Sequence, residues 1–393
     1  MKPAKTGRFV FISTMSGSPW GGSEELWSQA ALRLHQEGHE VSASVVWWPQ
    51  LSSKVASLAE QGVDVVTQTR PHPSLPVKVW RRIKIQLGIV RPEFSWLRRQ
   101  QPNLVVISQG YTQDGLEWMK YCSESSLPFV TIVQCNSEIV WPTDQTGSDM
   151  ARAYRAAKKV CCVSRHNLEL LRSQIGEALP NAEVVWNPFN VPADPPTAWP
   201  KETGVWKLAC VARLAPAAKG QDLLFQVLAQ PRWRDRPVEV NLYGAGPCEQ
   251  SLKRLANRWQ LSHVHFRGHV ANITDIWQHN HLLVLPSRCE GLPLALVEAM
   301  WCGRPAVVTD IGGNAEMCVD GETGFVAAAP ALGLLEQTLE RAWNRRDDWQ
   351  NMGKLARARA EQLVPKDAAG DFCRLLMECA ENHKAEIGKQ KRS

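Results

Sequence analysis

The chain has 393 residues, of which 44% are hydrophobic and 21% are charged, and its 45 basic and 39 acidic side chains leave a formal net charge of +6. This length exceeds what one hydrophobic core usually organises, so we expect two domains, and the composition excludes collagen-like, miniature and disordered proteins. The charge is too mild for a dedicated nucleic-acid binder, so we expect no nucleic-acid partner and favour a phosphorylated small molecule.

The sequence shows no targeting or membrane-spanning segment. No run approaches the roughly 18 apolar residues of a spanning helix, and Met1–Gly7 lead into a strand-like run without a signal-peptide pattern. We therefore expect a soluble, cytoplasmic protein. Eleven cysteines are scattered without a Cys-x-x-Cys pair, which predicts reduced core thiols and neither a disulfide framework nor a zinc site.

Short apolar runs rich in β-branched residues alternate with longer helical patterns, as in βαβ units on parallel sheets. A first series of predicted strands lies at 8–13, 40–46, 64–67, 103–108, 129–133, 159–163 and 183–185. A second series lies at 207–212, 238–243, 263–266, 281–285, 305–308 and 325–327. The fold class is therefore α/β, with two Rossmann-like doubly wound domains that face each other across a cleft.

A proline-rich stretch separates the two series. The prolines between Trp186 and Pro200 exclude helix interiors and central strands, so we predict an interdomain linker at 191–204. The N-terminal domain then covers 1–190 and the second covers 205–365. Helical stretches are predicted at 332–345, 349–363 and 367–382. Ligands of such sheets bind at the carboxyl ends of the strands.

The segment from Pro286 to Gly303 has the pattern of a strand end, a loop and a helix of about ten residues that starts at Pro293. Glu298 is the one charged side chain of this helix, and a buried carboxylate needs hydrogen-bond donors such as the vicinal diol of a ribose. Glu290, in the preceding loop, could reach a second polyol. The alternative is structural, with Glu298 paired to a core arginine and Glu290 interacting with the helix dipole.

Two basic residues follow the strand predicted at 207–212. Arg213 would leave the sheet at its carboxyl edge, and Lys219 with Gly220 would open the next helix, where two cations could hold a diphosphate. Ordinary surface cations are the alternative.

Two glycine-rich turns are weaker signals. Gly244-Ala245-Gly246-Pro247 lacks the third glycine of the dinucleotide fingerprint, so it does not indicate NAD. Gly21 and Gly22 lie between the first strand and a helix, where backbone N–H groups could line the cleft, or form a plain βα connection.

Other motifs argue against metal-assisted and serine hydrolysis. The histidines lack the spacing of zinc hydrolases, and no Gly-x-Ser-x-Gly occurs. Val79–Leu87 and Trp96–Arg99 interleave aromatic and basic residues, as membrane-surface or anionic-acceptor sites do. We favour the alternative of solvated amphipathic helices.

Taken together, these motifs resemble those of the GT-B-fold retaining glycosyltransferases of family 4. The matching segments are Ser-Arg-x-Glu-Gly-Leu-Pro-Leu-x-x-Val-Glu-Ala-Met with Glu290 and Glu298, Arg213 with Lys219-Gly220, Tyr243–Pro247, Phe266–Val270 and Gly312–Glu316. The resemblance covers roughly residues 205 to 330 and, in the N-terminal half, mainly the Gly21-Gly22 loop.

The resemblance implies a metal-independent hexosyltransferase, without a cofactor, that binds a nucleoside-diphosphate sugar in the second domain. Arg213, Lys219 and Glu290 would be its catalytic residues, the two cations neutralising the leaving diphosphate. The remaining donor-binding residues would be Glu298 at the ribose, the backbone of Gly291, Leu292, Pro293 and Leu294 at the sugar and phosphates, Val270 near the base, and Gly244.

The same resemblance assigns the acceptor to the first domain, against Gly21, Gly22, Gln134 and Asn136, with the last helix at 366–385 packed back on that domain. Many relatives have a histidine where this chain has Gln134, which removes a titrating group. The chain also has one extra residue between Arg213 and Lys219. The acceptor would be a saccharide, a lipid-linked or a small molecule, with peripheral membrane contact as an option.

Two other readings keep the fold. Nucleotide-sugar epimerases and glycan phosphorylases share the GT-B architecture, so the fold alone does not select the reaction. A non-catalytic nucleotide-sugar-binding or assembly protein is the second alternative.

Overall fold

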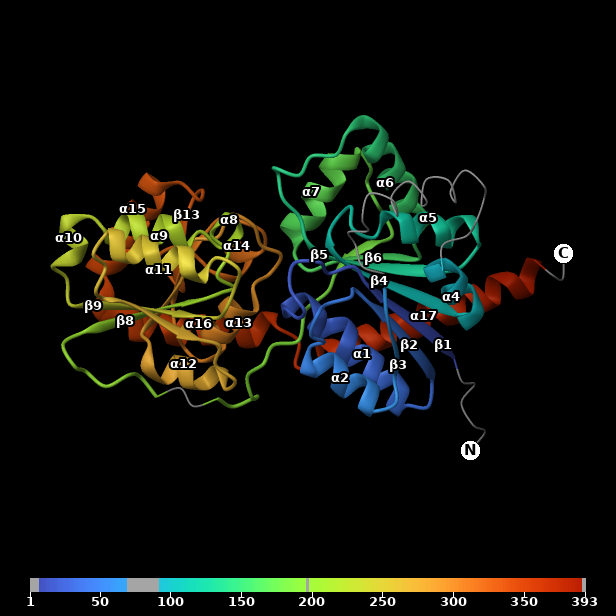
Figure 1. Ribbon diagram of the computed structural model, residues 1–393, viewed down its shortest axis with the longest axis horizontal. Coiled ribbons are helices and arrows are strands. Elements are labelled where there is room, and N and C mark those ends of the chain that lie inside the picture. Colours follow the sequence, from blue (N-terminus) through green and yellow to red (C-terminus); the bar gives the residue numbers. More distant parts are fainter. Residues whose placement is uncertain (1–6, 69–91, 196–197, 391–393) are drawn as a thin grey trace. The chain divides into compact units, whose positions relative to one another are not determined.

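The computed structural model describes residues 7–68, 92–195 and 198–390 (Figure 1). The chain divides into two units. Unit 1 comprises residues 1–163, 167–188 and 367–393, and unit 2 comprises residues 164–166 and 189–366. The segment Val79–Leu87, predicted to carry a basic aromatic helix, lies outside the described residues.

Unit 1 is built on a seven-stranded parallel sheet in the order β3-β2-β1-β4-β5-β6-β7. The strands are β1 (Arg8–Ser13), β2 (Glu40–Val45), β3 (Asp64–Thr67), β4 (Leu104–Tyr111), β5 (Phe129–Cys135), β6 (Lys159–Cys162) and β7 (Ala182–Val184). The helices are α1 (Glu25–Gln36), α2 (Ser53–Glu60), α4 (Pro92–Gln100), α5 (Leu116–Glu124), α6 (Asp144–Ala156), α7 (Arg165–Ile175) and α17 (Ala368–Gln390), with a 3-10 turn at Gly22–Glu24.

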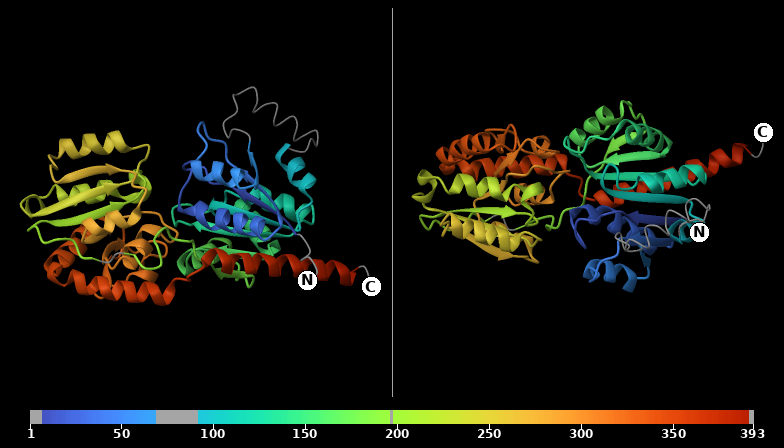
Figure 2. Two further views of the ribbon diagram at one scale, coloured as in Figure 1. Left: turned by 90° about the horizontal axis from the view of Figure 1, so that it is seen from below. Right: turned by 45° about the horizontal axis from the view of Figure 1, so that its top comes forward.

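Helices cover both faces of this sheet. Side chains of α4, α5, α6 and α7 share one apolar cluster with β1, β4, β5 and β6, whereas α17 packs against α1 on the opposite face (Figures 1 and 2). Trp96 packs on that cluster and Leu97 is fully buried, whereas Arg98 and Arg99 in the last turn of α4 are exposed, so the Trp96–Arg99 segment belongs to an amphipathic helix. On α17, Phe372 and Leu376 are buried. Asp367, just before α17, forms an ion pair with Arg33 of α1, with 2.7 Å between Arg33 Nη1 and Asp367 Oδ2.

Unit 2 has a six-stranded parallel sheet in the order β10-β9-β8-β11-β12-β13. Its strands are β8 (Trp206–Val211), β9 (Val238–Tyr243), β10 (Val264–Gly268), β11 (Leu282–Leu285), β12 (Ala306–Thr309) and β13 (Gly324–Ala327). Its helices are α8 (Pro216–Lys219), α9 (Gln221–Leu228), α10 (Pro231–Arg234), α11 (Glu249–Arg258), α12 (Ile273–His279), α13 (Leu294–Trp301), α14 (Asn314–Met317), α15 (Leu332–Asn344) and α16 (Trp349–Leu363), with a 3-10 turn at Arg346–Asp348.

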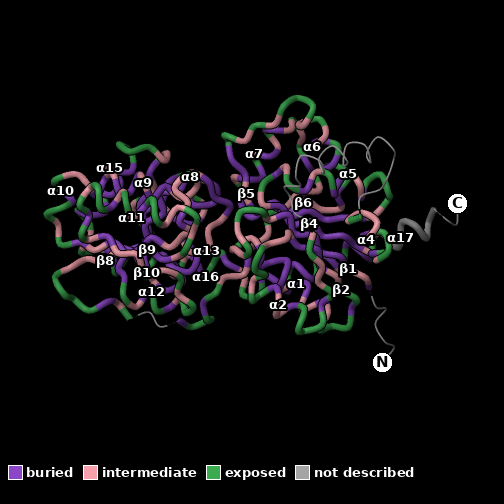
Figure 3. Tube along the Cα trace, viewed as in Figure 1, coloured by how far each residue is buried: buried purple, intermediate pink, exposed green. Residues whose placement is uncertain are grey.

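In unit 2, α15 packs against α9 on one face of the sheet, and α16 packs against α13 on the other. The strands β9, β11, β12 and β13 are buried along almost their whole length, whereas the edge strand β10 is mostly part-exposed (Figure 3). The two-domain α/β fold class is confirmed. The sequence also predicted every described strand to within a few residues, because parallel strands covered on both faces are continuous apolar runs.

Four details differ from the sequence-based expectation. The helix after Pro293 has eight residues, Leu294–Trp301, and Pro293 precedes it as the N-cap. Lys219 does not open a helix: it is the last residue of the short helix α8, and Gly220 separates it from α9. α17 extends to Gln390, beyond the predicted ends at 382 and 385.

Candidate functional site

The strand order of unit 2 reverses between β8 and β11. From β8 the chain proceeds through β9 to β10 in one direction, and from β11 it proceeds through β12 to β13 in the other. Such a reversal leaves a crevice at the carboxyl edge of a parallel sheet, where ligands of these folds bind. The segments after β8 and β11 carry Arg213, Lys219 and Glu290, so three residues predicted to be catalytic lie at this reversal point.

Lys219 and Glu290 form an ion pair at the reversal point. Lys219 Nζ lies 2.7 Å from Glu290 Oε1, and their side chains are 21% and 6% exposed. Ser287 Oγ donates to the same carboxylate oxygen at 2.7 Å. Because both charges are largely removed from water, this pair interacts more strongly than one on the surface. The cation that binds Glu290 comes from a residue 71 positions away in sequence.

Gly220 lets the two segments approach each other this closely. Its φ is +66°, and a Cβ built at this position would lie 1.8 Å from the carbonyl oxygen of Pro286. Only glycine combines a left-handed backbone with such an approach. The backbone of the α8–α9 connection is therefore pressed against the first residue after β11.

The loop that holds Glu290 is also supported from β12. Thr309 Oγ1 donates to the carbonyl of Ser287 at 2.6 Å, and the Gly313 N–H donates to the carbonyl of Gly291 at 2.6 Å. Residues 291–293 then lead into α13, so the predicted phosphate-binding backbone of Gly291, Leu292, Pro293 and Leu294 lies at the amino end of that helix. These contacts fix the position of Glu290 relative to the helix.

Glu298 is 3% exposed, as expected for the one charged residue of an apolar helix. Its Oε1 accepts the backbone N–H of Asn190 at 3.1 Å. Trp301, one turn further along α13, donates its Nε1–H to the carbonyl of Ala193 at 3.2 Å. The predicted linker is thus hydrogen-bonded along α13, and one donor to Glu298 is a backbone amide rather than a core arginine.

The other predicted donor residues lie at the carboxyl edge of the same sheet. Arg213 is half-buried, and its carbonyl accepts Gln221 Nε2 at 2.9 Å. Gly244 follows β9, and a Cβ there would lie 2.3 Å from the carbonyl oxygen of Ala212, so its glycine is required by packing. Val270 follows β10, two strands away from β8.

In unit 1 the strand order reverses between β1 and β4. The loop with Gly21 and Gly22 follows β1 and ends in two consecutive buried glutamates, Glu24 and Glu25, each 4% exposed. Ser13 Oγ and Trp27 Nε1 donate to Glu24 at 3.1 and 2.8 Å. Burial nevertheless raises the pKa of Glu24 to about 7.

Sequence reasoning did not identify Glu24. Adjacent glutamates at the start of a helix are ordinarily solvated, so their sequence does not predict burial. The one local indication was Ser13 at the end of β1, a hydrogen-bond donor for a buried carboxylate. Glu25 differs from its neighbour because it has a cation: Lys54 Nζ lies 2.6 Å from its Oε1. Trp20 Nε1 donates to the same oxygen at 3.0 Å.

Gln134 and Asn136 stand at the end of β5, one strand from β4. Gln134 is 5% exposed, and its Oε1 accepts Asn187 Nδ2 at 2.7 Å, while its Nε2 has no hydrogen-bond partner among the described residues. Asn136 Nδ2 donates to Gln174 Oε1 at 2.9 Å, and its Oδ1 accepts the N–H of Ser137. Asn136 therefore stabilises the turn after β5, whereas Gln134 retains an N–H donor.

Several further observations concern the chemistry that the described residues could support. All eleven cysteines are free, and nine of them are buried. Within the described ranges, no three His, Cys, Asp or Glu side chains are grouped so as to hold a metal ion. In the same ranges, no helix is both long and apolar enough to cross a membrane.

Part of the second unit matches a known protein family. Residues 206–343 match the family described as glycosyl transferases group 1. The matched segment contains Arg213, Lys219, Glu290 and Glu298.

Curated relatives match over part of their length. The chain is 32% identical over 166 residues to the D-inositol 3-phosphate glycosyltransferase of Gordonia bronchialis, covering 39% of this chain and 36% of that protein. It is 31% identical over 150 residues to the D-rhamnosyltransferase WbpZ of Pseudomonas aeruginosa, covering 37% and 38%. The chain therefore spans little more than a third of the length of these relatives.

Solved structures share the whole fold. HepE of Anabaena, crystallised with UDP and glucose, aligns with a TM-score of 0.70 at 17% identity, covering 97% of this chain and 99% of that one. The lipopolysaccharide outer core galactosyltransferase WaaB aligns with a TM-score of 0.67 at 17% identity, covering 96% and 99%. At these identities the likeness establishes the fold, which is that of GT-B glycosyltransferases.

Proposed function

We propose that this protein is a metal-independent, retaining glycosyltransferase that moves a sugar from a nucleoside-diphosphate sugar to a saccharide, lipid-linked or small-molecule acceptor. The observation that carries the proposal is the part-buried Lys219–Glu290 pair at the reversal point of unit 2, with the buried Glu298 eight residues after Glu290. A cation for a diphosphate and two carboxylates for sugar hydroxyls are the groups that such a donor requires.

In this proposal Glu298 binds the ribose hydroxyls, while Glu290 and the backbone from Gly291 to Leu294 hold the transferred sugar and the phosphates. The bond between the anomeric carbon and the β-phosphate oxygen breaks, and a bond from that carbon to the acceptor hydroxyl oxygen forms on the same face. The acceptor proton passes to the leaving phosphate. Lys219 and Arg213 stabilise the charge that develops on the diphosphate.

The acceptor is assigned to the carboxyl edge of the unit 1 sheet, against Gly21, Gly22, Gln134 and Asn136. The Nε2 group of Gln134 supports this assignment, because a buried donor without a protein partner gains most from a ligand oxygen. A neutral amide here also predicts that binding at this position does not depend on the titration of residue 134. Peripheral contact with the cytoplasmic face of a membrane remains part of the proposal.

The first experiment is a thermal-stability measurement with UDP, GDP, ADP and CMP in the presence of EDTA. A ligand at 100 times its dissociation constant stabilises the folded protein by about 2.7 kcal/mol, which a melting curve resolves. Glu298→Ala is the test variant, with an expected loss of about 1–3 kcal/mol of binding free energy. Glu361→Ala, at an exposed residue of α16, is the matched control.

A shift with one nucleotide that disappears in Glu298→Ala and persists in Glu361→Ala identifies the donor base and supports the ribose assignment. Transfer is then measured as nucleotide release from the corresponding sugar donors, and the anomeric configuration of the product is determined by NMR. Binding without transfer or hydrolysis favours the non-catalytic alternative, and inversion at the anomeric carbon or dependence on a divalent cation contradicts the proposed mechanism.

A further inference from the structure

Arg288 contacts residues on both sides of Lys219: two backbone carbonyls before it and one carboxylate after it. Its Nη1 donates to the carbonyl of Pro216 at 2.7 Å, three residues before Lys219. Its guanidinium also makes two parallel bonds to the Asp222 carboxylate, three residues after Lys219, at 2.6 and 2.8 Å. Its own backbone N–H donates to the carbonyl of Ala218 at 2.8 Å. The chain is therefore held at three points that surround Lys219.

The segment that supplies these contacts also supplies Glu290. Two residues after Arg288, the Glu290 carboxylate forms an ion pair with Lys219, with 2.7 Å between Lys219 Nζ and Glu290 Oε1. One loop after β11 thus fixes both the backbone that carries Lys219 and the tip of its side chain. Gly220, next to Lys219, packs closely against the Pro286 carbonyl. This packing restricts movement of the two segments relative to each other.

The contact between Arg288 and Asp222 fixes the relative orientation of two segments and contributes little electrostatic stabilisation. A guanidinium that meets a carboxylate through two parallel bonds fixes both distance and angle, which a lysine cannot do. Both side chains are 29% exposed, so the pair is partly screened and its contribution to stability is modest. Asp222 lies in the first turn of α9, so the pair connects that helix to the β11 loop.

We propose that Arg288 and Asp222 are positioning residues of the transferase site and that they act through Lys219. This inference rests on the proposed function, in which Lys219 stabilises the departing diphosphate. If the Arg288–Asp222 contact is lost, the backbone that carries Lys219 can shift, and the ion pair with Glu290 alone holds the ammonium. The charge then remains near the donor, and its alignment with the leaving oxygen suffers.

The expected kinetic effect follows from this alignment. Lys219 matters most as negative charge develops on the diphosphate, so displacing it lowers kcat more than it raises the donor KM. Displacements of about 1 Å at such groups cost up to about 100-fold in rate. We expect Asp222→Asn and Arg288→Lys to lower kcat by about tenfold to 100-fold, with a change in donor KM of less than about threefold.

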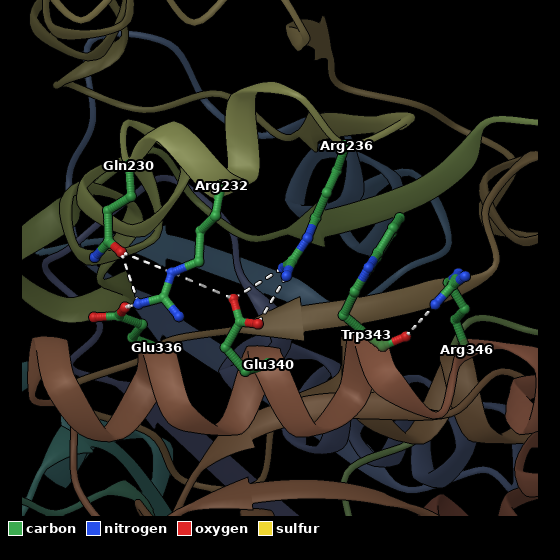
Figure 4. A network of polar contacts seen from close by, with 7 residues as sticks. All are labelled: Gln230, Arg232, Arg236, Glu336, Glu340, Trp343 and Arg346. Atoms are coloured by element: carbon green, nitrogen blue, oxygen red, sulfur yellow. Dashed lines mark hydrogen bonds and ion pairs between the residues drawn. The ribbon is translucent and has the colours of Figure 1, made fainter.

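A matched control exists on the other side of the same unit. Arg236 and Glu340 form the same two-bond pair at 2.9 and 2.7 Å, between the segment after α10 and α15 (Figure 4). Arg236 precedes β9, so the pair lies near the amino edge of the sheet, whereas the predicted donor residues lie at its carboxyl edge. Glu340→Gln removes a carboxylate charge in the same way as Asp222→Asn. It should lower the melting temperature at least as much, because its pair is less exposed, and leave kcat unchanged.

The experiment measures kcat and donor KM for the wild type, Asp222→Asn, Glu340→Gln, Lys219→Met and the double variant Asp222→Asn/Lys219→Met. If Asp222 acts through Lys219, the double variant has the same kcat as Lys219→Met alone. Effects that multiply, or a kcat for Asp222→Asn equal to that of Glu340→Gln, overturn the positioning role. Absence of transfer in the wild type with every donor counts instead against the proposed function, so the two failures are distinguishable.

Discussion

Glu24 gives unit 1 a pH-dependent stability that can be measured directly. It is an acid whose pKa is raised by burial from 4.5 to about 7, despite hydrogen bonds from Ser13 and Trp27 that lower it. Between these two values the folded protein keeps the proton and the unfolded chain loses it. The unfolding free energy therefore falls as pH rises from about 4.5 to about 7 and then levels off.

The magnitude follows from the size of the shift. A difference of 7 − 4.5 = 2.5 units corresponds to about 3 kcal/mol of stability lost above pH 7. Glu24→Gln removes this loss, because the amide is neutral at every pH and can accept from Trp27 while donating to the hydroxyl of Ser13. We expect the variant to exceed the wild type at pH 8.5 by up to about 3 kcal/mol, or about 5 °C or more in Tm, and to match it near pH 4.5.

Calorimetric melting curves at several pH values are the assay, since the difference between variant and wild type cancels the titration of all other groups. The neighbouring Glu25→Gln is the control: it removes the ion pair with Lys54 at 2.6 Å and should not stabilise the protein at pH 8.5. A Tm difference between Glu24→Gln and the wild type that is the same at pH 5 and pH 8.5 would show that Glu24 is not held in its protonated form by the fold.

Three further predictions concern stability. Gly220→Ala should destabilise unit 2 by about 3 kcal/mol or more and abolish nucleotide-dependent stabilisation in melting curves, because its Cβ meets the carbonyl oxygen of Pro286. A double-mutant cycle on Arg236 and Glu340, followed by thermal unfolding, should give a coupling of about 1–2 kcal/mol, since the pair is mostly buried but not fully desolvated. Leu376→Ala on α17 should cost about 2–5 kcal/mol and expose that helix to limited proteolysis, because Leu376 is fully buried.

The strands were predictable because their physical signal is local. A parallel strand buried on both faces, such as Leu104–Tyr111, is an apolar run that needs no information from its neighbours. The four-residue helix α8 was missed for the opposite reason, since it is too short to show helical periodicity. That omission misplaced Lys219 at the start of a helix, although its position at the carboxyl edge of the sheet was predicted.

The residue types of the candidate site in unit 2 were predictable, but their partners were not. An isolated charge in an apolar helix predicts burial, as found for Glu298, because burying a carboxylate without donors is costly. The pairing of Arg288 with Asp222 joins residues 66 positions apart, and nothing in either segment indicates the other. The burial of Glu24 likewise depends on Trp27 and on the strand beneath it.

The order of the strands explains which loops meet in unit 2, and the same rule applies to unit 1. β8 and β11 are neighbours although two strands separate them in sequence, so Lys219 and Glu290 meet. In unit 1 the corresponding neighbours are β1 and β4, where the Thr14 N–H donates to the carbonyl of Ser108 at 2.9 Å.

The loops after β1 and β4 carry Gly21, Gly22 and Glu24 on one side and Asp114 on the other, and burial raises the pKa of Asp114 as it does that of Glu24. Gln134 lies one strand further along the sheet. If the position of a ligand follows the reversal of strand order, the acceptor hydroxyl should therefore interact first with the β1 and β4 loops, and Gln134 should contact a more distant part of the acceptor.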